Sequence, residues 1–125
     1  MADMHSFGSM TLRPDGILHA MFDFGDVSPV DAASEYLAAR DELIGSNRVP
    51  VLVEIINIPY VDRSIREFLM GGMTPPPCRA VVVSDPAFLT MFRTYQLVDP
   101  TDVPTAIFAT VEAAVAWIHT QTAAG

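Results

Sequence analysis

Ser64 is the residue whose type and neighbours most clearly suggest chemistry. It stands at the predicted start of a helix, where free backbone amides and the helix dipole favour a phosphate group, and Arg63 and Arg66 supply counter-charges. Ser64 and Glu67 also have the Ser-x-x-Glu spacing of a capping box, which explains the serine without any modification. The sequence therefore leaves two interpretations of Ser64 and its neighbour Asp62, a helix cap and a regulated phosphosite.

Glu54 is the most unusual charge in the chain, because it interrupts an apolar, β-branched run over residues 49–58. A carboxylate within a buried strand has to pair, become neutral or face a cavity. We expect Glu54 to be hydrogen bonded to an arginine or to backbone amides, and the alternative is a ligand-binding or catalytic role. Open α/β sheets bind ligands at the carboxyl ends of their strands, which places any pocket near Glu54, Tyr60, Asp62 and Ser64. The candidate ligand or partner surface comprises Glu54, Tyr60, Arg63 and Arg66.

Other catalytic chemistry has no local pattern in the chain. His5, His19 and His119 are far apart and show no metal-ligand spacing. All seven basic residues are arginine, which excludes lysine Schiff bases and the phosphate-binding P-loop. The single cysteine, Cys78, has no catalytic signature around it, and there is no Gly-x-Ser-x-Gly elbow. We therefore predict no metal, no cofactor and no enzymatic activity.

The composition indicates one acidic domain over residues 1–125. Fifteen acidic and seven basic residues give a net charge of −8, which opposes binding to nucleic acids and to anionic membranes. No segment reaches the roughly 18 apolar residues of a transmembrane helix, and the first residues lack the basic start of a secretory signal. A lone cysteine suits a reducing compartment. We expect a cytoplasmic protein with no nucleic-acid partner and no membrane span.

Hydrophobic periodicity and turn residues predict the elements that must position these side chains. A β-hairpin is expected over residues 7–22, with Arg13-Pro14-Asp15-Gly16 as its turn. Three buried strands then alternate with helices: strands over 49–58, 80–83 and 105–109, and helices over 28–44, 62–70, 85–95 and from 110 onward. Right-handed crossovers would make the three buried strands adjacent and parallel. The predicted fold class is α/β, with a mixed sheet covered by helices.

Two of the predicted helices carry specific expectations about burial. In the first helix Val30, Ala33, Ser34, Leu37 and Ile44 fall within one arc and are expected to face the core. Residues 85–98 contain more bulky apolar side chains than one core-facing stripe requires. The surplus either packs deep in the core or forms a two-fold homodimer contact. The candidate dimer contacts are Phe88, Phe92 and Tyr95.

The run from Val51 to Ser64 resembles the central strand and the following helix start of STAS domains, the fold of the sporulation anti-sigma factor antagonist. Those domains offer the second serine of an Asp-Ser-Ser-Gly motif to a kinase. Asp62 matches the aspartate and Ser64 that serine, while Arg63 and Ile65 replace the first serine and the glycine. The resemblance places Ser64 at the position that the kinase phosphorylates in those domains, and it implies a candidate phosphosite there.

A wider similarity, over residues 16–118, is to the small bacterial proteins described as SpoIIAA-like or STAS/SEC14-like. The similarity rests on short pieces in the same order and spacing: Ala39-Arg40 and Leu43, residues 49–53, Asp62-Arg63, Val103-Pro104-Thr105 with Phe108, and Glu112, Ala114, Trp117 and Ile118. It implies a STAS-type fold and apolar ligands. Our sequence-based hypothesis is a non-enzymatic STAS-like interaction or regulatory module that self-associates; the alternative is a carrier or sensor of a lipid or another apolar small molecule.

Overall fold

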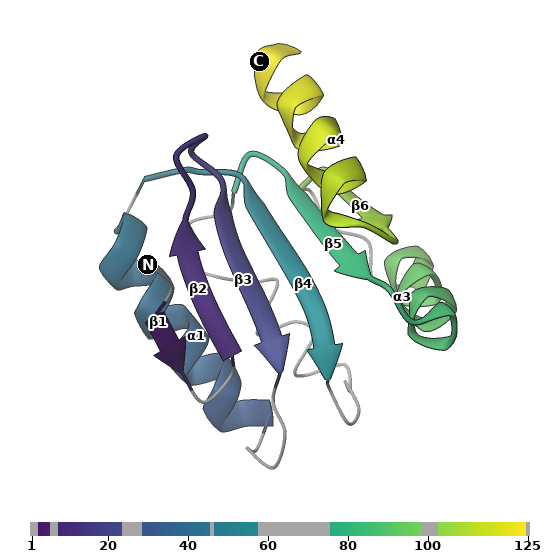
Figure 1. The fold of residues 1–125 in the computed structure, drawn as a ribbon, viewed down its shortest axis with the longest axis horizontal. Helices are drawn as coiled ribbons and strands as arrows, with labels where there is room; N and C mark the ends of the chain where they lie inside the picture. Colours follow the sequence, from purple (N-terminus) through teal and green to yellow (C-terminus); the bar gives the residue numbers. More distant parts are fainter. Residues whose placement is uncertain are drawn as a thin grey trace.

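The computed structural model describes residues 3–5, 8–23, 29–45, 47–57, 76–98 and 103–124. Along the chain these form β1 (Asp3–His5), β2 (Gly8–Leu12), β3 (Leu18–Asp23), α1 (Pro29–Ile44), β4 (Val51–Asn57), β5 (Arg79–Val83), α3 (Pro86–Val98), β6 (Thr105–Phe108) and α4 (Val111–Ala124). The described strands form one mixed sheet in the order β1-β2-β3-β4-β5-β6 (Figure 1). The predicted α/β class is thereby confirmed.

The first hairpin forms where its turn residues predicted it. Gly16 takes a φ of 85°, which favours glycine, and its amide donates to the Arg13 carbonyl at 2.9 Å. The Arg13 amide closes the turn with a 2.9 Å bond to the Ile17 carbonyl. β2 and β3 pair antiparallel on either side, with Thr11 opposite His19. β1, which the sequence did not predict, adds a short antiparallel strand to the outer edge of β2.

The three predicted buried strands are adjacent and parallel, as expected. β4 pairs with β5, and β5 with β6, in continuous register. β4 also pairs in parallel with β3, so it lies in the middle of the sheet. All four residues of β6 are only half-buried, contrary to the buried strand that we predicted, because β6 is an edge strand. The helix predicted over 62–70 lies outside the described residues.

Local capping residues also act as predicted. The Thr110 hydroxyl accepts a 3.2 Å bond from the Ala113 amide at the start of α4, and Asp85 Oδ1 accepts a 2.9 Å bond from the Ala87 amide at the start of α3. Gly45 ends α1 with a φ of 57° and donates its amide to the Asp41 carbonyl. Among the described residues, no helix has the length and apolar character needed to cross a bilayer.

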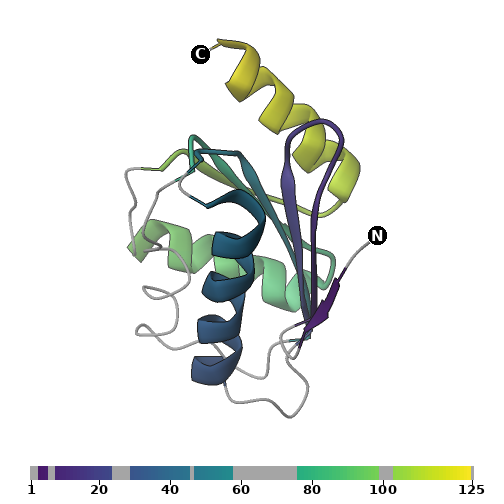
Figure 2. The same ribbon diagram turned by 90° about the vertical axis from the view of Figure 1, so that its left-hand side faces the viewer.

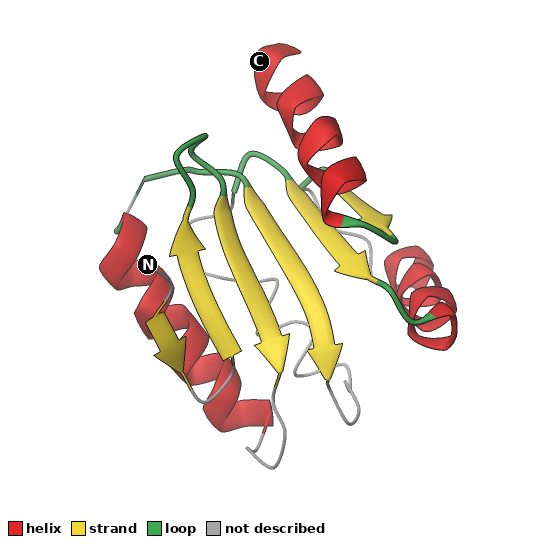
Figure 3. Cartoon of the chain, in the orientation of Figure 1, coloured by secondary structure: helices red, strands yellow, loops and turns green. Residues whose placement is uncertain are grey.

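The described helices cover the two faces of the sheet unequally. β3, β4, β5 and β6 follow one another in the same direction across the sheet, so right-handed crossovers between them lie on one face. α1 and α3 pack on that face, and α4, which follows the last strand, packs on the opposite face (Figures 2 and 3). The α1/α3 core includes Met10, Leu18, Phe22, Tyr36, Val53 and Val83, and the α4 core includes Ile17, Leu52, Cys78, Val82, Ala114 and Ile118.

The buried side of α1 differs from the predicted arc. Tyr36, Ala39, Arg40 and Ile44 are buried, Leu37 is half-buried, and Ser34 is exposed. The helix turns toward Tyr36 because this ring packs edge-on against Phe22 of β3, with centroids 5.1 Å apart. The expectation for Ser34 was therefore wrong.

Candidate functional site

Glu54 has a histidine as its partner. His19 Nε2 lies 2.9 Å from Glu54 Oε1, and each side chain is 20% exposed. The pairing is diagonal across two parallel strands, because the register aligns His19 with Leu52 and Met21 with Glu54. Our expectation of an arginine or backbone partner was wrong, because the β3–β4 register places this histidine within reach.

Strand alternation places a group of half-covered side chains around this pair. Every second residue of β2, β3 and β4 points into the α1/α3 core: Met10, Leu18, Ala20, Phe22, Val53 and Ile55. The residues between them therefore point to the side of α4. We call this group the open face: Thr11, His19, Met21, Glu54 and Ile56. α4 packs over β4, β5 and β6, and no described helix packs over the open face. Ile56 consequently remains 49% exposed on a central strand.

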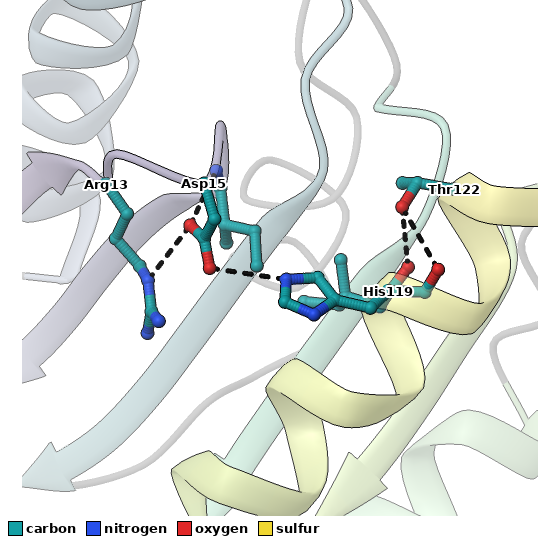
Figure 4. A network of polar contacts seen from close by, with 6 residues as sticks. Arg13, Asp15, His119 and Thr122 are labelled. Carbon is teal, nitrogen blue, oxygen red and sulfur yellow. Dashed lines mark hydrogen bonds and ion pairs between the residues drawn. The ribbon is translucent and has the colours of Figure 1, made fainter.

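A polar network joins the β2–β3 turn to α4 at one end of the open face (Figure 4). Asp15 Oδ1 is 3.1 Å from Arg13 Nε, and Asp15 Oδ2 is 3.3 Å from His119 Nε2. Partial burial of the Asp15 carboxyl would raise its pKa, but the bonds from Arg13, from the Ile17 amide and from His119 together hold that pKa below its ordinary value. Asp15 therefore stays ionised and links the hairpin turn to α4.

A second polar group lies on the opposite face, inside the α1/α3 core. Arg40 and Arg79 are 7% and 6% exposed, and both act electrostatically on the buried Tyr36 phenol. Burial raises the pKa of Tyr36, against the opposing charges of the two arginines. Burial lowers the pKa of Arg79; Tyr36 counteracts this effect, and the positive charge of Arg40 reinforces it. Sequence reasoning missed these buried arginines, because arginine is ordinarily a surface residue.

Most of the predicted site residues lie beyond what the structure describes. Tyr60, Asp62, Arg63, Ser64 and Arg66 all fall within residues 58–75, outside the described residues. The choice between a cap and a phosphosite at Ser64 therefore stays a prediction.

The candidate dimer contacts Phe88, Phe92 and Tyr95 lie on α3, but their side chains are outside the described set. Of the predicted site residues, the structure describes the side chain of Glu54 alone. It brings Glu54 together with His19, which we had not included in the site.

The described side chains contain no group of three histidine, cysteine or acidic residues close enough to hold a metal ion. Cys78 is buried, and burial raises the pKa of its thiol. The thiol is thus held in its less reactive, protonated form. Of the described surfaces, the open face is the one that combines an exposed apolar side chain, Ile56, with a partly buried polar pair, His19 and Glu54.

Comparison with known proteins gives a family without a known function. A family model described as "Domain of unknown function (DUF7793)" matches residues 10–122. A solved structure of a protein with unknown function from Arthrobacter sp. FB24 is 20% identical, covers 88% of this chain and 97% of that chain, and has a TM-score of 0.32. A search of curated proteins found no match.

The family match overturns the resemblance to SpoIIAA-like, STAS/SEC14-like proteins, because the family whose model covers most of the chain is a different one. The quoted similarities were short apolar strand and helix segments, which many α/β domains share. The phosphorylation of Ser64 that this resemblance implied loses its family support.

Proposed function

The chain belongs to the DUF7793 family, and we propose that it is a non-enzymatic interaction module that binds a basic amphipathic helix of a partner protein on the open face. The observation that carries this proposal is the partial cover of one sheet face: α4 packs on β4–β6, while Ile56, near the carboxyl end of the central strand β4, is 49% exposed. A large apolar side chain on a central strand is ordinarily covered.

The open face has the width of one helix. It extends over β2, β3 and β4, and two inter-strand spacings amount to roughly 10 Å, which is about the diameter of an α-helix. A helix laid there would lie beside α4 and complete a second helical layer on this face (Figure 1). Met21 and Ile56 would contact its apolar side.

The charges of the open face favour a basic partner. Glu54 lies within it, Asp23 is exposed at the end of β3, and Asp15 is at the hairpin turn. Arg13 at the same turn is already paired with Asp15. A second copy of this chain would bring the same acids and its own net charge of −8 against this surface, so a basic partner is the better match.

The contact with His19 fixes the orientation of the Glu54 carboxylate. The His19 ring holds one carboxylate oxygen at 2.9 Å, and the carboxylate can accept further bonds through its remaining lone pairs. An arginine or lysine of a docked helix would use that capacity. The polar pair would then orient the helix, and the apolar contacts would supply most of its binding energy.

A designed peptide pair tests this function without knowledge of the natural partner. The probes are synthetic helices of about 14 residues, one built from leucine and lysine and the other from leucine and glutamate. Fluorescence anisotropy should show binding of the basic helix alone, and amide chemical shifts should change around Met21, Glu54 and Ile56. Shift changes confined to α1 or α3 would contradict the proposal.

A matched pair of variants separates local docking from general charge attraction. Ile56 and Leu12 are 49% and 42% exposed on opposite faces of the sheet, and arginine at either position changes the net charge equally. Ile56→Arg should weaken binding of the basic helix by about tenfold or more, whereas Leu12→Arg should change it by less than about threefold. Equal losses in both variants would show that only the overall charge attracts the peptide, and the proposed site would be wrong.

A further inference from the structure

β6 is the edge strand at the end of the sheet opposite to β1, and the backbone of its outer side is a second feature of this sheet. The Arg79 amide donates to the Pro104 carbonyl at 2.8 Å, and the register pairs Arg79 with Thr105 and Val81 with Ile107. In a parallel pair of this register, the backbone groups of Ala106 and Phe108 face β5. The amide and carbonyl of Ile107 therefore point away from the sheet, and among the described residues nothing bonds to them.

The two edges of the sheet differ in how well they resist pairing with another strand. β1, at one edge, has three residues and begins with the acidic Asp3. β6, at the other edge, contains Thr105, Ala106, Ile107 and Phe108, with no charge and no proline. Charged residues, prolines and bulges are the ordinary protection of exposed edges. The β6 edge lacks the first two, and its side chains are only half-buried.

β6 and α3, the helix that packs beside it, carry no acidic residue. α3, which packs beside β5 and β6, has Arg93 as its single charged residue among 13. The acidic residues of this part of the chain come before and after β6, at Asp99, Asp102 and Glu112. Two copies that meet through β6 and α3 bring no acidic side chain of these two elements against each other, whereas two copies that meet at the open face would bring Glu54 against Glu54.

We propose that β6 pairs antiparallel with β6 of a second copy of this chain, so that the two sheets join into one across a two-fold axis. An edge strand that pairs with itself makes the same contacts in both copies, and the assembly closes at two subunits. Ile107 supplies its outward amide and carbonyl to the joint ladder. α3 flanks the joint on one face, which is consistent with its predicted apolar contact residues.

Proline at position 107 tests the pairing, because the Ile107 amide does not bond to β5. Ile107→Pro should leave the β5–β6 ladder intact but remove the outward donor in both copies. Light scattering should then show a chain of 13.6 kDa, whereas the wild type should show twice that mass. The dissociation constant should rise by roughly a hundredfold, as expected for two lost hydrogen bonds at a symmetric joint.

Ile107→Ala is the matched control, because it removes the side chain but keeps the outward amide. This variant should remain a dimer, although both variants lose packing against the α3 side. Hydrogen exchange of the wild type gives a test that needs no substitution: the Ile107 amide should be protected at high protein concentration and exchange rapidly on dilution. A monomeric wild type, or a dimer whose Ile107 amide exchanges rapidly, would overturn the proposal.

Ile56→Arg distinguishes this inference from the proposed docking of a basic helix. β5 lies between the open face, which ends on β4, and the β6 edge, so this variant should weaken peptide binding and leave the dimer mass unchanged. A loss of dimer on Ile56→Arg would place the contact on the open face instead, and the β6 joint would be wrong.

Discussion

Gly8 at the start of β2 offers the sharpest test of the hairpin geometry. Its φ is 134°, and a Cβ placed there would overlap the Met21 carbonyl oxygen and lie 3.1 Å from the Asp23 amide nitrogen. Both are backbone atoms of the paired strand β3, so rotation of a side chain cannot relieve the contact. Gly16 is the matched control, because it also has a positive φ, 85°, but a Cβ there would meet nothing within 4 Å.

Replacement of Gly8 or Gly16 by alanine lowers the unfolding free energy for one common reason, and at Gly8 for a second reason as well. Replacement by alanine at a positive φ costs roughly 1–2 kcal/mol, and this cost applies to both positions. Only at Gly8 must β2 and β3 also separate, which breaks at least one ladder hydrogen bond and loosens the packing behind it, at roughly 1–3 kcal/mol more. We expect Gly16→Ala to cost about 1 kcal/mol and Gly8→Ala about 3 kcal/mol.

Urea unfolding followed by circular dichroism measures both free energies, and the m-value checks that each variant unfolds in one step. The corresponding falls in melting temperature are about 4 °C and 10 °C or more. Equal costs at the two glycines, or a smaller cost at Gly8, would refute the close approach of β2 to β3 at this residue.

Three further predictions concern single residues, and a fourth concerns lipid binding. Cys78 should react with a thiol reagent only after unfolding, because it is buried and burial raises the pKa of its thiol; rapid labelling of the native protein would contradict this. Asp15→Asn should lower the unfolding free energy by roughly 0.5–1 kcal/mol at pH 7; because the folded pKa of Asp15 is lowered, the difference between variant and wild type should vanish as the pH falls through that pKa, and a difference that persists in acid would be inconsistent with this cause. Ser64→Ala should cost about 1 kcal/mol if Ser64 is a helix cap, and identical partners pulled down with wild type, Ser64→Ala and Ser64→Asp would exclude a phosphorylation switch. Organic extraction of the native protein should yield lipid if the chain is a carrier, and fatty acids that neither bind nor change the melting temperature would exclude that alternative.

The features that could be predicted from the sequence are those that depend on residues close together in the chain. Pro14, Asp15 and Gly16 predicted the hairpin turn, Thr110 the start of α4 and Gly45 the end of α1, because turns and caps involve bonds over a few residues. Apolar β-branched runs predicted β4 and β5, since a strand buried on both faces cannot carry polar alternation. The resemblance to SpoIIAA-like proteins was wrong because it also depended on short segments, and similar segments occur in unrelated α/β domains.

Only the tertiary structure decided which side chains meet. Glu54 pairs with His19 because the β3–β4 register brings residues 35 positions apart within 2.9 Å, and no local pattern encodes a register. Tyr36 and Arg40 are buried, and Ser34 is not, because the rotation of α1 follows its contact with Phe22. The open face exists because right-handed crossovers put α1 and α3 on one side of the sheet, and α4, the described helix on the other side, covers only part of the strands.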